Sequence, residues 1–290
     1  MLANDQFTAD LMDNEELFSD EFFKRFELRH RPSPLQLSDS ISKDYQFPTF
    51  YGDASCAIAI FHCDYEAAKS MMPHPSMEPV KMTKGRSLVI FSCYEYRNVM
   101  NVAPYNEIAM TIPVVVNGGM NVPVLTMLLG DKLKNFGYHV FHMPVTSLEN
   151  RIRGRKIWGL PKTLENIHIE TQGSSSVIKA SVGDQPPYFQ LTVPTDGSAQ
   201  SFDVSSNLYS VLDGHRLKSE TNFKGNFKLN KNMGALLKRD ALATEGESSL
   251  VLGEGEEADR LRKLKIEATP FQTRYTPSMN ACFDLPMESV

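Results

Sequence analysis

The stretch PYNEIAMTIPVVVNGG, residues 104–119, gives the clearest secondary-structure signal in the chain. It is a largely apolar run that ends at Asn117–Gly118, a pair that favours a tight turn between two strands. Pro113 lies inside the run and has no backbone N–H, which indicates an edge, a bulge or an irregular strand. We therefore predict a β-strand that carries the carboxylate of Glu107 near its start.

Further strands are predicted on both sides of this run. Segments of apolar or alternating pattern and strand length occur at 55–63, 86–96, 138–145, 165–172, 175–183 and 187–194. Two extended pieces follow near the end of the chain, at 266–275 and 280–286. Most of these strands follow one another closely, which favours antiparallel pairing. The chain is therefore expected to form an α+β domain, mainly antiparallel β, whose strands curl into a barrel.

Short helices are predicted between the strands, at 64–73, 122–137, 146–159 and 256–265. Pro73 and Gly137 are expected to end the first two, and Thr146 or Ser147 to cap the third. The stretch 201–245 has no clear pattern, although its segment 232–243 is a weaker helix candidate.

Residues 1–44 are predicted to be a helical N-terminal extension and linker, and residues 45–290 the barrel domain. Between residues 5 and 29, phenylalanine and leucine recur at roughly helical spacing among acids and lysines. A Ser- and Pro-rich linker follows this segment. The Phe-rich face is expected to pack on its own domain or on a neighbouring subunit.

Composition narrows the classes of partner. The net charge of −5 argues against nucleic acid, because phosphate binding favours a basic surface. The four cysteines form no CxxC pair and are expected to be reduced core thiols. The acidic N-terminus does not resemble a signal peptide, and no run approaches the roughly 18 apolar residues of a membrane span. We expect a soluble, cytoplasmic protein without a membrane partner.

Lys162 is the strongest candidate for a reactive side chain. It follows Pro161 in GRKIWGLPKT, residues 154–163, which also contains the single tryptophan, Trp158. A lysine in an apolar pocket loses its charge more easily, and the neutral amine is the form that attacks carbonyls. Most lysines are solvated, and a glutamate within a strand, such as Glu107, more often lies on the solvated face. The cationic run around Arg155 is commonly a solvated helix end, or one member holds an anion.

Two other patterns give weaker signals. GEGEEA, residues 253–258, matches a dinucleotide-binding turn superficially, but its three glutamates would repel a diphosphate. The seven histidines show no metal-ligand spacing, so no metal site is predicted.

Taken together, these segments resemble the acetoacetate decarboxylase-like superfamily. GRKIWGLPKT is similar to the family's Gly-Arg-Glu and Pro-Lys-Lys signature, and PYNEIAMTIPVVVNGG to its Tyr-x-Glu strand. FHCDYEAAKSMMPHP, residues 61–75, and the C-terminal segment from Ser249 to Pro286 also resemble the family's, in the same order. The resemblance covers about residues 45–290.

The resemblance implies a closed, mostly antiparallel β-barrel with flanking helices, assembled into a homo-oligomer. It implies that Lys162 forms a Schiff base with a small oxo acid, that Glu107 is catalytic, and that no cofactor is needed because the imine is the electron sink. Arg155, Tyr105 and Trp158 are then expected to contact substrate.

Four positions depart from the family pattern. The signature's second lysine is Thr163, its glutamate is Lys156, a second active-site glutamate falls on Ser92, and an arginine of the first strand falls near Ser55. Burial alone lowers a lysine pKa by up to about 3 to 5 units, so a buried Lys162 is still expected to act as a nucleophile. The four departures are therefore expected to change the substrate more than the covalent chemistry.

Three functions follow from this reading. The first is decarboxylation of acetoacetate or a related β-keto acid by a lyase with a Schiff-base lysine. The second is a different Schiff-base reaction, such as aldol condensation and dehydration, on a 2-oxo acid. The third is a barrel that binds a small ligand without turnover.

Overall fold

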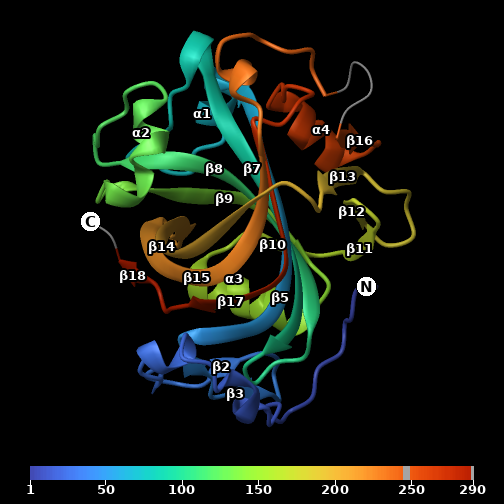
Figure 1. The fold of residues 1–290 in the computed structure, drawn as a ribbon. Helices are drawn as coiled ribbons and strands as arrows, with labels where there is room; N and C mark the ends of the chain where they lie inside the picture. The colour runs from blue at the N-terminus through green and yellow to red at the C-terminus, as the bar shows by residue number, and fades with distance from the viewer. Residues whose placement is uncertain (244–248, 289–290) are drawn as a thin grey trace.

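Seven strands close into a mixed β-barrel (Figure 1). One of them, at residues 105–116, is the strand that the sequence predicts most clearly. The computed structural model describes residues 1–243 and 249–288. Around the barrel the strands follow the order β9 (Phe136–Val145), β14 (Ser198–Leu212), β15 (His215–Lys231), β17 (Gln272–Phe283), β5 (Thr49–Asp64), β7 (Arg86–Val99) and β8 (Tyr105–Val116). Pairing of β8 with β9 closes the ring, so the predicted barrel is confirmed.

Most neighbouring strands are antiparallel, as predicted, and β9 accounts for the exceptions. Both β14 and the short strand β10 (Lys162–Leu164) run parallel to β9. The irregularity expected in the strand with Pro113 is present as a register shift between Met110 and Thr111, opposite β9. The strand β8 is buried along its whole length.

A second, smaller sheet covers part of the outer face of the barrel. Its strands are β11 (Asn166–Gln172), β12 (Ser175–Ser181), β13 (Phe189–Pro194) and β16 (Leu250–Leu252). The main apolar core lies between this sheet and the barrel, where the Phe91 and Phe189 ring centroids are 5.2 Å apart. The barrel is therefore stabilised largely from outside.

Three of the predicted helices form. They are α1 (Tyr65–Ser70), α3 (Leu148–Trp158) and α4 (Glu256–Lys263). Asp64 caps α1 by accepting from the Ala67 N–H, and Ser147 caps α3 by accepting from the Asn150 N–H. None of the helices in the described ranges has the length and apolar character that a bilayer crossing requires.

The helix predicted over 122–137 is wrong. Only α2 (Leu125–Leu128) and the 3₁₀ turn η4 (Gly130–Lys132) form, and Gly137 lies inside β9. The Thr126 hydroxyl hydrogen-bonds to the backbone of Met120 and Val122. These contacts hold a compact loop in place of a continuous helix. The weaker candidate at 232–243 forms only the 3₁₀ turn η5 (Met233–Leu236).

The long helix expected between residues 5 and 29 is also absent. Two 3₁₀ turns, η1 (Glu15–Phe18) and η2 (Phe23–Arg25), carry Phe18, Phe22 and Phe23 onto Phe50 of β5. The Phe23 and Phe50 ring centroids are 4.9 Å apart. The Phe-rich face therefore packs on its own barrel.

The remaining elements are short and lie at the margins of the barrel. They are β1 (Arg29–His30), β2 (Leu35–Gln36), β3 (Ser42–Lys43), β4 (Gln46–Phe47), β6 (Met77–Pro79), η3 (Thr83–Gly85) and β18 (Met287–Glu288). In the N-terminal part, β1 pairs with β4 and β2 with β3.

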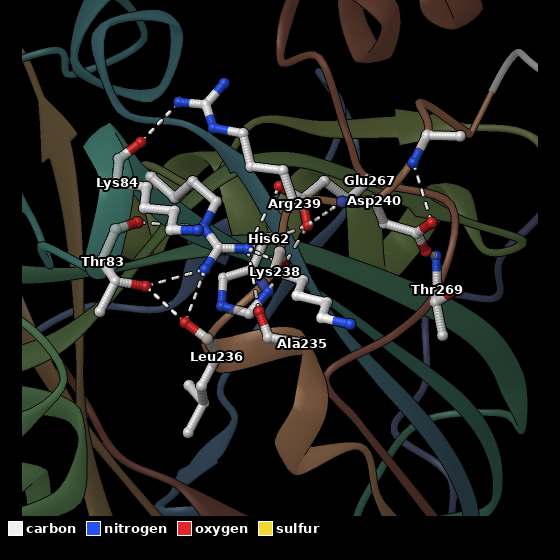
Figure 2. Close-up of polar contacts among 12 residues, drawn as sticks. His62, Thr83, Lys84, Ala235, Leu236, Lys238, Arg239, Asp240, Glu267 and Thr269 are labelled. Carbon is white, nitrogen blue, oxygen red and sulfur yellow. Dashed lines mark hydrogen bonds and ion pairs between the residues drawn. The ribbon is translucent and has the colours of Figure 1, made fainter.

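One buried ion pair fastens the loop after β15 to the barrel (Figure 2). The Arg86 guanidinium donates to Glu267 Oε2 at 3.1 Å and to the carbonyl oxygens of Ala235 and Leu236, both at 3.0 Å. Arg86 is 2% exposed, so these contacts replace its water shell. His62 lies beside the pair, with Nδ1 4.0 Å from Glu267 Oε2.

We expect Arg86→Met to lower the free energy of unfolding by about 3 to 5 kcal/mol, because it leaves the Glu267 carboxylate buried without its cation. The measurement is urea denaturation. Arg239→Met is the matched control, since this arginine is exposed and, among the described residues, donates to the Lys84 carbonyl alone. A similar decrease in the free energy of unfolding in both variants would contradict a stabilising role for the buried Arg86–Glu267 pair.

We expect His62 to make the fold sensitive to mild acid. Burial and the neighbouring Arg86 lower the pKa of His62 to about 4. Below about pH 6.5, His62 therefore binds a proton in the unfolded state, whereas it stays neutral in the folded state until about pH 4. The contribution of neutral His62 to stability is therefore fully present above about pH 6.5. As the pH falls to 4, the free energy of unfolding decreases by up to about 3 kcal/mol. Stability measured across this range should fall less in His62→Leu; an unchanged slope would rule out this role.

Candidate active site

A glycine turn aims Lys162 into the barrel. Helix α3 ends at Trp158, and Gly159 takes the left-handed conformation with φ of 60°. A Cβ on Gly159 would lie 2.5 Å from the Val211 carbonyl oxygen, so only glycine fits. The chain then turns through Leu160 and Pro161, and Lys162 begins β10 opposite Met143 of β9.

Gly154 provides the space for the lysine stem. A Cβ at this position would lie 2.4 Å from Lys162 Cδ, closer than atoms can approach. The absence of a side chain on this face of α3 therefore lets the lysine pack against the helix. The two ends of GRKIWGLPK thus fold back onto each other.

Lys162 and Glu107 form a buried pair. Lys162 Nζ lies 2.6 Å from Glu107 Oε2, and the residues are 5% and 4% exposed. The Tyr96 hydroxyl donates to the other carboxylate oxygen of Glu107 at 3.3 Å. The ring of Tyr105 lies beneath the amine, 5.7 Å from Nζ to the centroid. The structure thus brings three predicted residues together.

Burial is the main influence on the charge of Lys162. It lowers the pKa of the amine, the Glu107 carboxylate opposes it, and the Arg153 guanidinium lowers it further. The net effect is a lysine pKa below its ordinary value. The pair is therefore suited to proton exchange between an amine and a carboxylate.

The pair borders a cavity of about 100 Å³ inside the barrel. The lining includes Trp158, Arg153 and the side chains Tyr51, Tyr94, Tyr96, Glu107, Ala109, Met143, Asn150, Leu160, Lys162, Leu208, Thr221, Phe223, Met279, Ala281, Cys282 and Phe283. Trp158 is held by a hydrogen bond from its Nε1 to the Asp284 carbonyl and stacks on Phe283. A small molecule in this cavity would meet an amine, a carboxylate and a guanidinium within apolar walls.

Arg153, and not Arg155, supplies the guanidinium. Arg153 is 2% exposed and donates to Asn150 Oδ1 at 2.9 Å and to Thr49 Oγ1 at 3.0 Å. Its Nε has no hydrogen-bond partner in the part of the chain that the structure describes, and no carboxylate there forms an ion pair with it. Arg155 is exposed and lies outside the cavity lining, and Tyr105 is buried but also lies outside it, so of the three predicted substrate contacts the structure places only Trp158 at the cavity.

The positions that depart from the family pattern lie elsewhere. Thr163 turns away from the cavity, and its hydroxyl donates to Glu165. Lys156 is exposed and donates to the Gln36 carbonyl. Ser55 bonds to Glu95, whereas Ser92 points into the barrel beyond the Lys162 cavity. The neighbouring cation is therefore Arg153.

Apart from Tyr105, sequence reasoning missed the tyrosines around Glu107. Tyr94 and Tyr96 share a strand face with Ser92, so the alternation of β7 contains the signal once one member is known to face inward. Tyr51 reaches the site from β5, and its ring centroid lies 4.6 Å from that of Tyr96. No local pattern indicates that contact, because it depends on barrel closure.

Solved structures with the same fold include acetoacetate decarboxylase from Legionella pneumophila, with a TM-score of 0.59 at 14% identity over 90% of this chain and 92% of that one. The enduracididine biosynthesis enzyme MppR complexed with pyruvate gives a TM-score of 0.56 at 13% identity, over 88% and 98%. An acetoacetate decarboxylase-like enzyme from Sphingomonas wittichii RW1 gives a TM-score of 0.51 at 12% identity, over 88% of this chain and 95% of that one. No curated protein matches the sequence.

The sequence profile of one family, acetoacetate decarboxylase, matches residues 32–279. That range spans most of the chain, including six of the seven barrel strands, most of β17 and both members of the buried pair. This chain therefore belongs to the acetoacetate decarboxylase family.

Proposed function

We propose that this protein is a lyase that decarboxylates a 3-oxo acid through a Schiff base on Lys162. One observation carries the proposal: the Lys162 amine is buried in a cavity, 2.6 Å from the Glu107 carboxylate. The pair supplies a nucleophile and a proton acceptor in one place.

The first step requires the neutral amine. Glu107 accepts a proton from Lys162, and the amine attacks the ketone carbon of the substrate to form a carbinolamine. This intermediate loses water, with a proton returned to the leaving hydroxyl, and becomes a protonated imine. Burial and the charge of Arg153 both favour the neutral amine at the start.

The second step breaks the carbon–carbon bond. Arg153 holds the substrate carboxylate, since guanidinium is suited to bidentate carboxylate binding. The bonding electrons flow into the protonated imine as carbon dioxide leaves, giving an enamine. Protonation of the enamine carbon and hydrolysis of the imine then release the ketone and restore Lys162. The imine itself is the electron sink.

A second candidate uses the same lysine on a 2-oxo acid. The observation that favours it is the fold shared with MppR, which has been solved with pyruvate and with a condensation product of pyruvate and an aldehyde. In that case the imine would lead to carbon–carbon bond formation. A non-catalytic barrel would bind either acid without a covalent adduct.

We expect incubation with acetoacetate and sodium borohydride to add a reduced adduct to Lys162, detected by intact mass and peptide mapping. Lys162→Ala should abolish the adduct and lower carbon dioxide release to background. Lys156→Ala is the control, because that lysine is exposed on α3, the helix against which the Lys162 stem packs. Adduct with pyruvate alone would support the second candidate, and no adduct with any oxo acid would refute Schiff-base chemistry.

We expect Arg153→Met to lower kcat/KM for acetoacetate at least about tenfold, because the substrate carboxylate loses its charged partner. It should also raise the pH at which cyanoborohydride trapping reaches half of its maximal rate, since Arg153 lowers the pKa of Lys162. Arg155→Met is matched in chemistry and in helix, and should change either value by less than about twofold. A larger loss of kcat/KM in Arg155→Met than in Arg153→Met would show that Arg155 contacts the substrate carboxylate.

We expect Gly154→Ala to reduce adduct formation at least about tenfold, because the added methyl group takes the place of Lys162 Cδ. Circular dichroism and thermal unfolding would show that the barrel still forms. Unchanged trapping kinetics in a folded variant would mean that the lysine reaches substrate by another path.

A further inference from the structure

The inward-facing residues of β5, β7 and β8 form successive rows across the barrel. Register pairing gives three rows: Cys56–Tyr94–Glu107, Ile58–Ser92–Ala109 and Ile60–Ile90–Thr111. The first row borders the Lys162 cavity through Tyr94 and Glu107. The third lies four residues further along each strand, or roughly 13 Å at about 3.3 Å per residue.

The middle row leaves the barrel open. Ser92 and Ala109 are small where the neighbouring rows carry Tyr94 or Ile90. Barrels of this size are commonly filled by inward side chains, so two adjacent small residues on neighbouring strands create space. Ala109 borders the Lys162 cavity on one side and a second chamber on the other.

The second chamber is larger and mostly apolar. Its volume is about 220 Å³, compared with about 100 Å³ around Lys162. Six residues line both spaces: Tyr94, Ala109, Leu208, Thr221, Phe223 and Met279. The residues that line only the far chamber include Ile58, Ile60, Ile90, Met127, Phe136, Phe202 and Val204. The two spaces are therefore adjoining parts of one interior.

The geometry points to a substrate that is a 3-oxo acid with an unbranched apolar chain, its ketone at Lys162 and its chain in the far chamber. This inference rests on the proposed function and specifies its substrate class. The carboxylate of such an acid lies at Arg153, and its chain passes Ala109 and Ser92. Burying each methylene in the apolar chamber should improve binding about fourfold. Acetoacetate, with no chain beyond its terminal methyl, would leave that chamber unused.

Among the described residues that line the far chamber, Arg274 is the charged one. Its guanidinium lies 5.0 Å from the Phe202 ring centroid and donates to Gln272 Oε1 at 3.1 Å. A second carboxylate at the end of a substrate chain would be attracted to it. A dicarboxylic probe therefore distinguishes an apolar chain from one with an anionic end.

The test compares decarboxylation of acetoacetate, 3-oxooctanoate and 3-oxooctanedioate by the full chain. We expect kcat/KM for 3-oxooctanoate to exceed that for acetoacetate at least tenfold, from about fourfold per buried methylene. Val204→Trp fills the far chamber and should remove most of that preference while leaving acetoacetate within about twofold. Ser205→Trp, the control, introduces the same side chain on the exposed side of β14 and should change neither rate.

The outcomes separate this inference from the proposed function. A borohydride adduct on Lys162 with acetoacetate, but no preference for the longer acid, overturns only the chain site. A preference for 3-oxooctanedioate over 3-oxooctanoate overturns the apolar chain. No adduct with any of the three acids overturns the Schiff base itself. If Val204→Trp fails to fold, trapping rates of the wild-type chain across 3-oxo acids of increasing length give the same answer.

Discussion

The buried pair of Lys162 and Glu107 is the constraint on which the rest of the site depends. Removing two charges from water carries a penalty of several kcal/mol for each ion, and an apolar pair of similar volume is often as stable. The pair is therefore weak evidence for stability and stronger evidence for chemistry. Its neighbours act on position: Gly154 admits the lysine stem, Tyr96 bonds the carboxylate, and Gly159 sets the direction of approach.

An interior that contains two adjoining cavities cannot also supply the whole core. The barrel compensates with packing on its outer face, where Phe91 meets Phe189 and the small sheet covers β5 and β7. The N-terminal phenylalanines add a separate cluster on Phe50. This division lets the inward row keep Ser92 and Ala109 small, because the free energy of folding comes mainly from the other side of the same strands.

The limits of sequence prediction follow the same division. The meander of β11 to β13 was predictable because each strand has one face in the core and one in solvent, which gives clear alternation. The strands β14 and β15 were not, because one face meets solvent and the other a cavity, so few positions require a large apolar side chain. In the N-terminal segment, aromatic spacing indicated burial correctly but not the helix, since packing on Phe50 is satisfied by two short turns.

The choice between Arg153 and Arg155 shows what the sequence of the site contained. Residues two positions apart on an α-helix lie about 200° apart around its axis, so Arg153 and Arg155 face nearly opposite directions. Ile157 and Trp158 are the large apolar residues at the end of α3, and the residues four positions before them share their face. Those residues are Arg153 and Gly154, which are buried, whereas Arg155 is exposed. The motif that carries the resemblance identified the right helix turn, whereas helical geometry decides which guanidinium accompanies the lysine into the barrel.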